Sequence, residues 1–471
     1  MNIWVTKTPT EIEDASEHTQ LKKNLTAFDL AALGIGSVVG TGIFVATGQG
    51  AHLAGPGVLL SFIIAAVTCG FCALTYAELA CMFPVAGSTY SYSYVAFGEV
   101  IAWIIGWDLM LEYLVAASAV ASGWSTTFIG LIESAGIKLP KVLITPAVTM
   151  NSAGKIVLSG GLVDAPAVII TLLITWILYI GIKESAKINN IIVAIKIAVI
   201  LLFIFLGIRH VSLANLHPMM PFGWKGVMAG AAIIFFAYIG FDAVSTAAEE
   251  TKNPKKDVPL GLMLCLGVVI VLYVAVAYVL TGNVPYEQID IGNALPAALA
   301  RIGIQWGGAL VATGAIIGMI STLLVTLYGQ IRIFMVMARD GLLPAAFSKV
   351  HSEHKTPHIC TWITGIATAV IAAVFPLPMI IDLCNIGTLF AFILVSIGVV
   401  LLRKTRPEVE RKFRTPGVPV TPLITVAFCF YLMYHLPGVT WVRFGLWLAA
   451  GLLIYFLYSV HHSRLQLQRV K

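Results

Sequence analysis

Charged residues are scarce in this chain of 471 residues. Lysine, arginine, aspartate and glutamate together make up 11% of the sequence, whereas 59% of it is hydrophobic. Soluble domains carry about 25% charged residues, and no soluble core can bury this much apolar surface. The composition therefore excludes a soluble enzyme or binding module and predicts an all-α polytopic membrane protein.

Motifs for catalysis, metal binding and secretion are also missing. The apolar segments contain no HExxH, no GxSxG and no paired histidines. Cys69 and Cys72 form a CxxC without a second CxxC or a nearby histidine, so we interpret them as small buried hydrophobic side chains. The polar stretch 1–24 lacks the apolar region of a signal peptide. We therefore expect no enzymatic activity, no cofactor and no metal.

Long apolar runs are what the chain does contain. We identify twelve runs of roughly 20 residues, the length that crosses a bilayer, centred near residues 38, 68, 112, 174, 199, 238, 270, 318, 365, 391, 429 and 451. With the N-terminus inside, the inner segments carry 21 lysines and arginines, the outer segments carry 7, and Lys196 completes the 29. The positive-inside rule then predicts that both termini lie in the cytoplasm, and we expect the protein in the plasma membrane. The basic excess is an orientation signal, so we expect no nucleic-acid partner.

Glycines interrupt the first of these runs. Residues 34–44 read G-I-G-S-V-V-G-T-G-I-F, and each glycine weakens a helix by about 1 kcal/mol relative to alanine. An opened helix in a bilayer must be buried in protein or line a site. If the helix opens near Gly40, the N–H groups of residues 41–43 attract an anion such as a carboxylate. The alternative is that Gly36 and Gly40 allow close helix packing.

A second interruption lies in the sixth run, at Gly240. The preceding half-helix ends near residues 236–238, and its unpaired carbonyl groups suit an ammonium ion. A carboxylate site that faces an ammonium site describes an α-amino acid. Phe236 is either a lid over this site or an ordinary core aromatic residue. Two interrupted helices that lie five runs apart are typical of an inverted five-plus-five repeat.

Ionisable residues within the runs are the next candidates. Lys196 is the only charge in residues 191–208, and it either exchanges a proton from a buried position or snorkels toward the cytoplasm. Asp108 and Glu112 share a helix face, with Glu112 the candidate for proton relay or amine binding and Asp108 for a polar network. Asp242 either caps the second half of the sixth helix or takes part in coupling.

The motifs around these residues resemble those of the amino acid–polyamine–organocation superfamily. Its first-helix signature is similar to G-S-V-V-G-T-G-I-F (residues 36–44), and its sixth-helix signature to F-F-A-Y-I-G-F-D (residues 235–242) followed by E-E-T-K-N-P. The cationic amino acid transporter branch has motifs that resemble W-D-L-M-L-E-Y (residues 107–113) and A-R-D-G-L-L-P (residues 338–344). The loop between its second and third helices resembles P-V-A-G-S-T-Y-S-Y (residues 84–92). The motifs occur in order over nearly the whole chain.

This resemblance implies a leucine-transporter-type fold that works by alternating access. The fold has twelve transmembrane helices in a five-plus-five inverted repeat, with helices 1 and 6 broken. On this basis we expect a cytoplasmic tail at 1–24, a first repeat at 25–209 (helices 1–5) and a second repeat at 210–402 (helices 6–10). A cytoplasmic loop, helices 11–12 and the C-terminal tail then occupy 403–471.

The resemblance also implies roles for single residues. Lys196 stands where sodium-coupled relatives place a sodium ion, so its charge would repel sodium and its titration would couple transport to protons. Glu112 falls where some relatives bind the charged end of the substrate. The candidate substrate-binding residues are Val38, Val39, Gly40, Thr41, Gly42, Ile43, Glu112, Phe236, Ala237, Ile239 and Thr326. The candidate coupling residues are Lys196, Glu112 and Asp242, with Ser321 and Thr322 as neighbours of Lys196.

The sequence thus predicts a secondary transporter that imports amino acids, coupled to protons. Its expected partners are the amino acid, the proton and the lipid bilayer, and an accessory single-helix subunit stays open. Two alternatives remain. One is a permease of the same fold for a small sugar-like or sulfur-containing metabolite. The other is a sensor that no longer transports.

Overall fold

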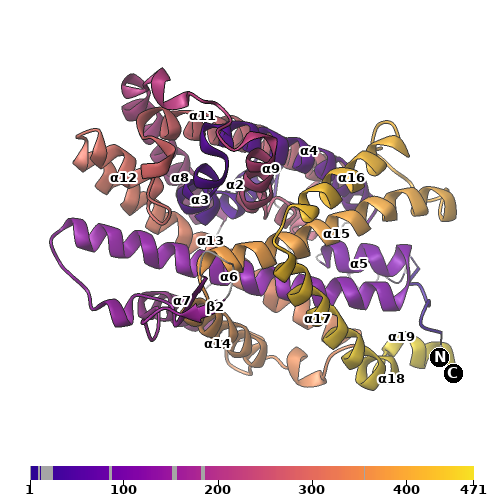
Figure 1. Ribbon diagram of the computed structural model, residues 1–471. Coiled ribbons are helices and arrows are strands. Elements are labelled where there is room, and N and C mark those ends of the chain that lie inside the picture. Colours follow the sequence, from indigo (N-terminus) through magenta and orange to yellow (C-terminus); the bar gives the residue numbers. More distant parts are fainter. Residues whose placement is uncertain are drawn as a thin grey trace.

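Helices dominate the computed structural model (Figure 1). The structure describes residues 2–8, 11, 25–83, 87–150, 156–181, 186–354 and 356–470, so most of the predicted tail 1–24 lies outside the described residues. The first half contains α2 (Ala27–Val38), α3 (Thr47–Ala54), α4 (Val58–Met82), α5 (Ser88–Ala96), α6 (Glu99–Ser134), α7 (Ala165–Ile180) and α8 (Ala186–Gly207). The second half contains α9 (Gly223–Ile234), α10 (Ala243–Thr246), α11 (Pro254–Asn283), α12 (Ala294–Arg301), α13 (Gln305–Arg339), α14 (His358–Val374) and α15 (Leu377–Thr405). The C-terminal part contains α16 (Val420–Tyr434), α17 (Gly438–Ile454), α18 (Val460–His462) and α19 (Arg464–Val470).

Eight helical segments of the described chain are long and apolar enough to cross a membrane. Shorter apolar helices are α2, α7, α14 and α16. Every predicted centre falls within a helical segment, and those at residues 38 and 238 lie beside breaks. The one sheet in the described chain has two antiparallel strands, β1 (Val148–Met150) and β2 (Ile156–Leu158), with Val148 opposite Leu158. The structure thus confirms a helical protein with many apolar segments.

Two long helices, α6 and α13, form the centre of the molecule (Figure 1). They have 36 and 35 residues, so at about 1.5 Å per residue each exceeds the roughly 30 Å thickness of a bilayer core. Helix α6 also packs against α15 and α17. At the α17 contact, the rings of Trp107 and Trp447 stack 4.5 Å apart, and each indole N–H donates to the other residue's carbonyl group. Gly451 makes room for the Trp107 ring.

The two ends of the chain lie side by side (Figure 1). The Arg469 guanidinium donates a hydrogen bond of 2.8 Å to the Thr6 carbonyl oxygen. The buried carboxylate of Glu99, at the start of α6, accepts hydrogen bonds from Tyr455 (3.0 Å) and Gln466 (2.7 Å). These contacts hold the C-terminal segment against the end of the bundle at which α6 begins.

The segment expected between the second and third membrane helices does lie between α4 and α6, but its second half is helical rather than a loop. Residues 88–92 belong to α5, and residues 84–86 lie outside the described residues. The run S-T-Y-S-Y-S-Y is polar and lacks an apolar stripe, so it carries no helix signal of its own. It becomes helical where Tyr90, Tyr92 and Tyr94 are buried against neighbouring elements. The prediction for Cys69 and Cys72 is confirmed, because both are buried and neither forms a disulfide.

Candidate functional site

The first interrupted helix opens at Val39. Helix α2 ends at Val38, and Val39 has an extended backbone with φ of −76° and ψ of 93°. A π-helical turn, η1 (Gly42–Ala46), then leads into α3. Residues 38–47 are all buried. The break is therefore enclosed by protein, as an irregular segment at membrane depth requires.

The second interruption follows a 3-10 turn, η6 (Phe235–Tyr238), at the end of α9. Ile239 is extended, with φ of −62° and ψ of 141°. Gly240 has φ of +108°, a backbone conformation that side chains oppose and glycine tolerates. Asp242 precedes α10 but makes no side-chain capping hydrogen bond. Its own backbone is already helical, whereas N-cap residues are usually extended. Asp242 therefore does not form the usual N-cap, and its carboxylate instead faces the backbone N–H groups of Gly240 and Ala243.

Glycines bring the two breaks into contact. A Cβ atom on Gly42 would lie 2.3 Å from the Cα atom of Ala237, and a Cβ on Gly240 would lie 2.7 Å from Ser37 Oγ. Both distances are shorter than ordinary van der Waals contacts, which begin at 3.4 Å. The turns η1 and η6 thus meet through backbone atoms. Close packing also occurs at Gly40, whose Cβ would lie 3.1 Å from Thr322 Oγ1, so the helix opens and its glycines pack as well.

Lys196 of α8 points into the first break. Its side chain is buried, and Nζ donates hydrogen bonds to the Gly36 carbonyl oxygen (2.5 Å) and to Thr322 Oγ1 (2.8 Å). A Cβ on Gly318 would lie 2.9 Å from Lys196 Cγ, so this glycine leaves space for the lysine stem. Snorkelling is therefore wrong. The amine instead neutralises the carbonyl end of α2, where a helix carries partial negative charge.

Hydroxyl groups also lie against carbonyl groups at the end of α2. The Tyr273 hydroxyl of α11 donates to the Val38 carbonyl oxygen at 3.1 Å. Thr322 Oγ1 lies 3.2 Å from the Gly36 carbonyl oxygen and 3.4 Å from that of Val39. Sequence reasoning missed Tyr273, although a buried tyrosine in an apolar span usually needs a partner for its hydroxyl. After the break, a new helix begins, and the first N–H groups of a helix have no carbonyl acceptors within it. This helix start therefore carries partial positive charge, whereas the end of α2 carries partial negative charge.

Two carboxyl groups, those of Asp242 and Glu112, interact at the second break, and a third, that of Asp108, neighbours Glu112. Glu112 of α6 interacts electrostatically with Asp242 and lies beside the Thr388 hydroxyl of α15, and Tyr113 faces Asp242 through its hydroxyl. Asp108 lies one turn closer to the start of α6. It is fully buried, and neither of its oxygens has a hydrogen-bond partner among the described residues. The polar network expected around Asp108 is therefore not seen in this part of the chain.

The structure brings some of the predicted site residues into contact and leaves others apart. The breaks bring the turn η1 against the turn η6, with Gly42 opposite Ala237. Thr326 does not join a shared hydrogen-bond network, because its hydroxyl donates to the Thr322 carbonyl oxygen of its own helix at 2.8 Å. Ser321 is buried, and its hydroxyl has no partner among the described residues. Ile239 is partly exposed, whereas the following are buried: Val38, Val39, Gly40, Thr41, Gly42, Ile43, Glu112, Phe236, Ala237 and Thr326.

Comparisons with known proteins agree with this architecture. The family model described as amino acid permease matches residues 25–457. A methylthioribose transporter of Bacillus subtilis is 49% identical to the chain, with 98% of each protein covered. A branched-chain amino acid permease of the same organism is 48% identical over 96% of this chain and 97% of its own. Cationic amino acid transporter 9, chloroplastic, of Arabidopsis thaliana is 34% identical over 94% and 89%.

Proposed function

The chain belongs to the amino acid permease family, and from this premise we propose that it imports an amino acid by proton-coupled alternating access. The observation that carries the proposal is the buried Lys196 amine bound to the Gly36 carbonyl oxygen beside the opened helix. A titratable cation is thereby attached directly to the segment that would hold the substrate. A change in its protonation alters the hydrogen bond that fixes the end of α2.

The two breaks support an amino acid as cargo. The N–H groups of residues 41–43 offer hydrogen-bond donors and a positive helix end to a carboxylate. The carbonyl groups at the end of η6 offer acceptors to an ammonium ion. Because Gly42 lies against Ala237, the N–H donors and the carbonyl acceptors are adjacent. The carboxylate and ammonium groups of an α-amino acid require such an arrangement.

The charges around the breaks support the proposed coupling to protons. A protonated Lys196 holds the Gly36 carbonyl and repels a sodium ion from the same position. Glu112 and Asp242 interact electrostatically, and two carboxylates this close ionise together only at a large energetic cost unless a cation neutralises them. We propose that a substrate ammonium group or a proton supplies that charge in turn.

The membrane arrangement is proposed on the same basis. Two breaks five spans apart, in the first and sixth, fit a five-plus-five inverted repeat of helices 1–10 followed by two further helices. The adjacent termini and the basic inner loops fit a plasma-membrane protein with both ends in the cytoplasm. The repeats would occupy residues 25–209 and 210–402.

A second candidate cargo is a sulfur-containing sugar. The relative named as a methylthioribose transporter is as similar to this chain as the relative named as a branched-chain amino acid permease. A sugar has no ammonium group, but its hydroxyl groups can donate to the carboxylates of Glu112 and Asp242 and accept from the N–H groups of residues 41–43. The breaks alone therefore leave both cargoes in place.

The deciding experiment is a thermal-shift panel followed by uptake into proteoliposomes. The panel contains branched-chain and cationic amino acids and methylthioribose, and a ligand present at 100 times its Kd stabilises the folded state by about 2.7 kcal/mol. We expect stabilisation and uptake with at least one amino acid. Stabilisation by methylthioribose and by none of the amino acids would replace the first candidate with the second.

A further inference from the structure

A basic pocket lies where the start of α11 meets the loop between α15 and α16. Its volume is about 390 Å³, and it is lined by Lys255, Lys256, Pro259, Lys412 and Phe413. We propose that this pocket binds the phosphate group of an anionic phospholipid from the cytoplasmic leaflet. The inference rests on the orientation given under the proposed function, and it adds a lipid site to the transport site.

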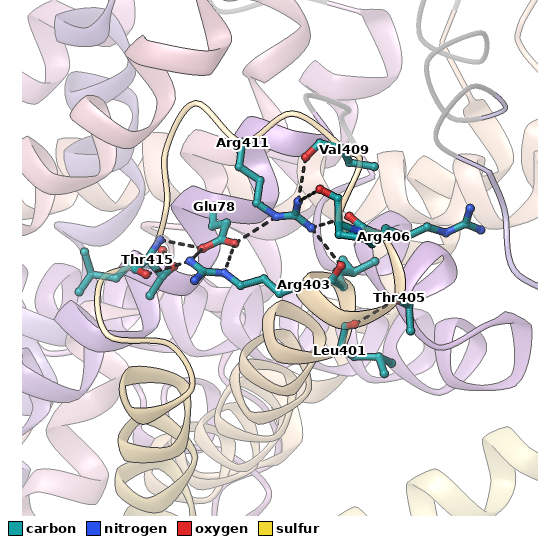
Figure 2. Close-up of polar contacts among 11 residues, drawn as sticks. Glu78, Leu401, Arg403, Thr405, Arg406, Val409, Arg411 and Thr415 are labelled. Carbon is teal, nitrogen blue, oxygen red and sulfur yellow. Dashed lines mark hydrogen bonds and ion pairs between the residues drawn. The ribbon is translucent and has the colours of Figure 1, made fainter.

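A buried carboxylate anchors the loop that carries two of the lining residues, Lys412 and Phe413 (Figure 2). Glu78, near the end of α4, accepts hydrogen bonds from Arg403 Nε (2.9 Å) and Nη2 (2.7 Å) and from the Thr415 backbone N–H (2.7 Å). Its side chain is 1% exposed. Thr415 therefore anchors the far end of the loop to α4, and Arg403 anchors the end of α15 at the same point.

Arg411 fixes the middle of the same loop (Figure 2). Its guanidinium donates to the carbonyl oxygens of Val409 (2.8 Å), Arg406 (2.8 Å) and Leu402 (3.0 Å). Lys412 and Phe413 lie between these two anchors, at Arg411 and Thr415. The backbone that carries them is thus held on both sides before any ligand arrives, which lowers the entropy lost on binding.

Positive charge converges on the pocket from both sides. Residues 252–257 contain three lysines and one aspartate, a net charge of +2. Residues 403–414 contain six lysines and arginines and two glutamates, a net charge of +4, so the two segments together carry +6. The positive-inside rule accounts for basic loops but not for their meeting at one pocket. Basic pockets between helices on the cytoplasmic side are typical sites for lipid phosphate groups.

One carboxylate already pairs with a lining lysine. Lys255 Nζ lies 3.1 Å from Glu410 Oε2, and these side chains are 40% and 65% exposed. Exposed ion pairs of this kind contribute little to stability. A phosphate group can therefore displace Glu410 at small cost and contact Lys255 together with the other two lysines.

The apolar lining favours a lipid over free phosphate. Pro259 and Phe413 offer no hydrogen-bond donors from their side chains, but they can pack against a glycerol backbone. Further along α11, the side chains of Leu260, Val268 and Val271 are exposed on the outer surface of the helix. An acyl chain that follows this surface leaves its phosphate group at the three lysines.

The test measures lipid binding to the purified full-length protein in neutral detergent. The probes are short-chain phosphatidylglycerol, short-chain phosphatidylcholine and soluble sn-glycerol 3-phosphate. The variant carries Lys255→Gln, Lys256→Gln and Lys412→Gln. Its matched control carries Lys138→Gln, Lys141→Gln and Lys225→Gln, which are exposed lysines outside the pocket.

The wild type and the control variant should bind phosphatidylglycerol more tightly than phosphatidylcholine. The pocket variant should lose affinity for phosphatidylglycerol by on the order of a hundredfold. Phe413→Ser should weaken phosphatidylglycerol binding and leave glycerol phosphate binding unchanged. Equal phosphatidylglycerol affinity in the pocket variant and the wild type would overturn the proposal.

One further outcome would also overturn the proposal. Glycerol phosphate that binds as tightly as the lipid, with the same dependence on the lysines, would make this a site for free phosphate and overturn the lipid assignment. Because the assay contains no transported substrate, its failure is distinguishable from failure of the transport proposal.

Discussion

Replacing Gly42 with alanine should push the two broken helices apart. The new Cβ would lie 2.3 Å from Ala237 Cα, whereas ordinary contacts begin at 3.4 Å, so one segment must move by 1.1 Å. Overpacking of a tightly packed interior costs about 1–3 kcal/mol. If the bound state bears this strain, substrate affinity falls by roughly 5- to 150-fold. The variant is compared with the wild type by thermal unfolding and by binding of the cargo found in the panel.

Gly70 of α4 supplies the matched control. A Cβ at this position meets no atom within 4 Å, so Gly70→Ala adds only helix propensity, worth about 1 kcal/mol. The control should unfold at the wild-type temperature or higher and bind the cargo normally. If Gly42→Ala behaves like Gly70→Ala in both measurements, the two breaks are not in contact as described and the reasoning fails.

Three further substitutions test charges outside this contact. Asp108→Asn should leave the unfolding temperature unchanged or raise it, because a buried ionised carboxylate without hydrogen-bond partners is strongly unfavourable. Marked destabilisation would instead show that the native residue is ionised and paired. Burial raises the pKa of the Asp164 carboxyl, which precedes α7, from 3.8 to about 6. The folded protein then holds this proton more tightly than the unfolded chain, so ionisation costs stability as the pH rises from about 4 to 6. Asp164→Asn should gain stability relative to the wild type over that window, by on the order of 2–3 kcal/mol, and parallel pH profiles would contradict this. Glu78→Gln should destabilise the protein by about 3–5 kcal/mol in thermal unfolding, because it leaves Arg403 without its buried partner. The exposed control Glu408→Gln should not destabilise it. Equal effects of the two substitutions would refute the anchoring role of Glu78.

The breaks were predictable from the sequence because their signals are local. Four glycines in residues 34–44 and the glycine at 240 mark positions where the backbone opens, whatever the rest of the chain does. The contact between Gly42 and Ala237 was not predictable in the same way. It joins residues far apart in the sequence and depends on how the two half-helices cross.

The environment of single charges was harder to predict than the helices. The acceptor for Lys196 lies 160 residues away in α2, so the sequence left both burial and snorkelling open. Asp242 has the residue type of a helix cap, but its backbone is helical and the cap does not form. Helix α5 has no apolar stripe and becomes helical through the burial of its tyrosines. In each case the outcome depends on tertiary neighbours.

Proton-driven uptake by Lys196→Met tests the central claim most directly. Proteoliposomes with an inward proton gradient, with and without sodium, are incubated with labelled cargo in the external solution. The wild type should accumulate cargo independently of sodium, and the variant should bind cargo but fail to accumulate it, because methionine cannot exchange a proton beside Gly36. Full pH-dependent accumulation by Lys196→Met would contradict the account.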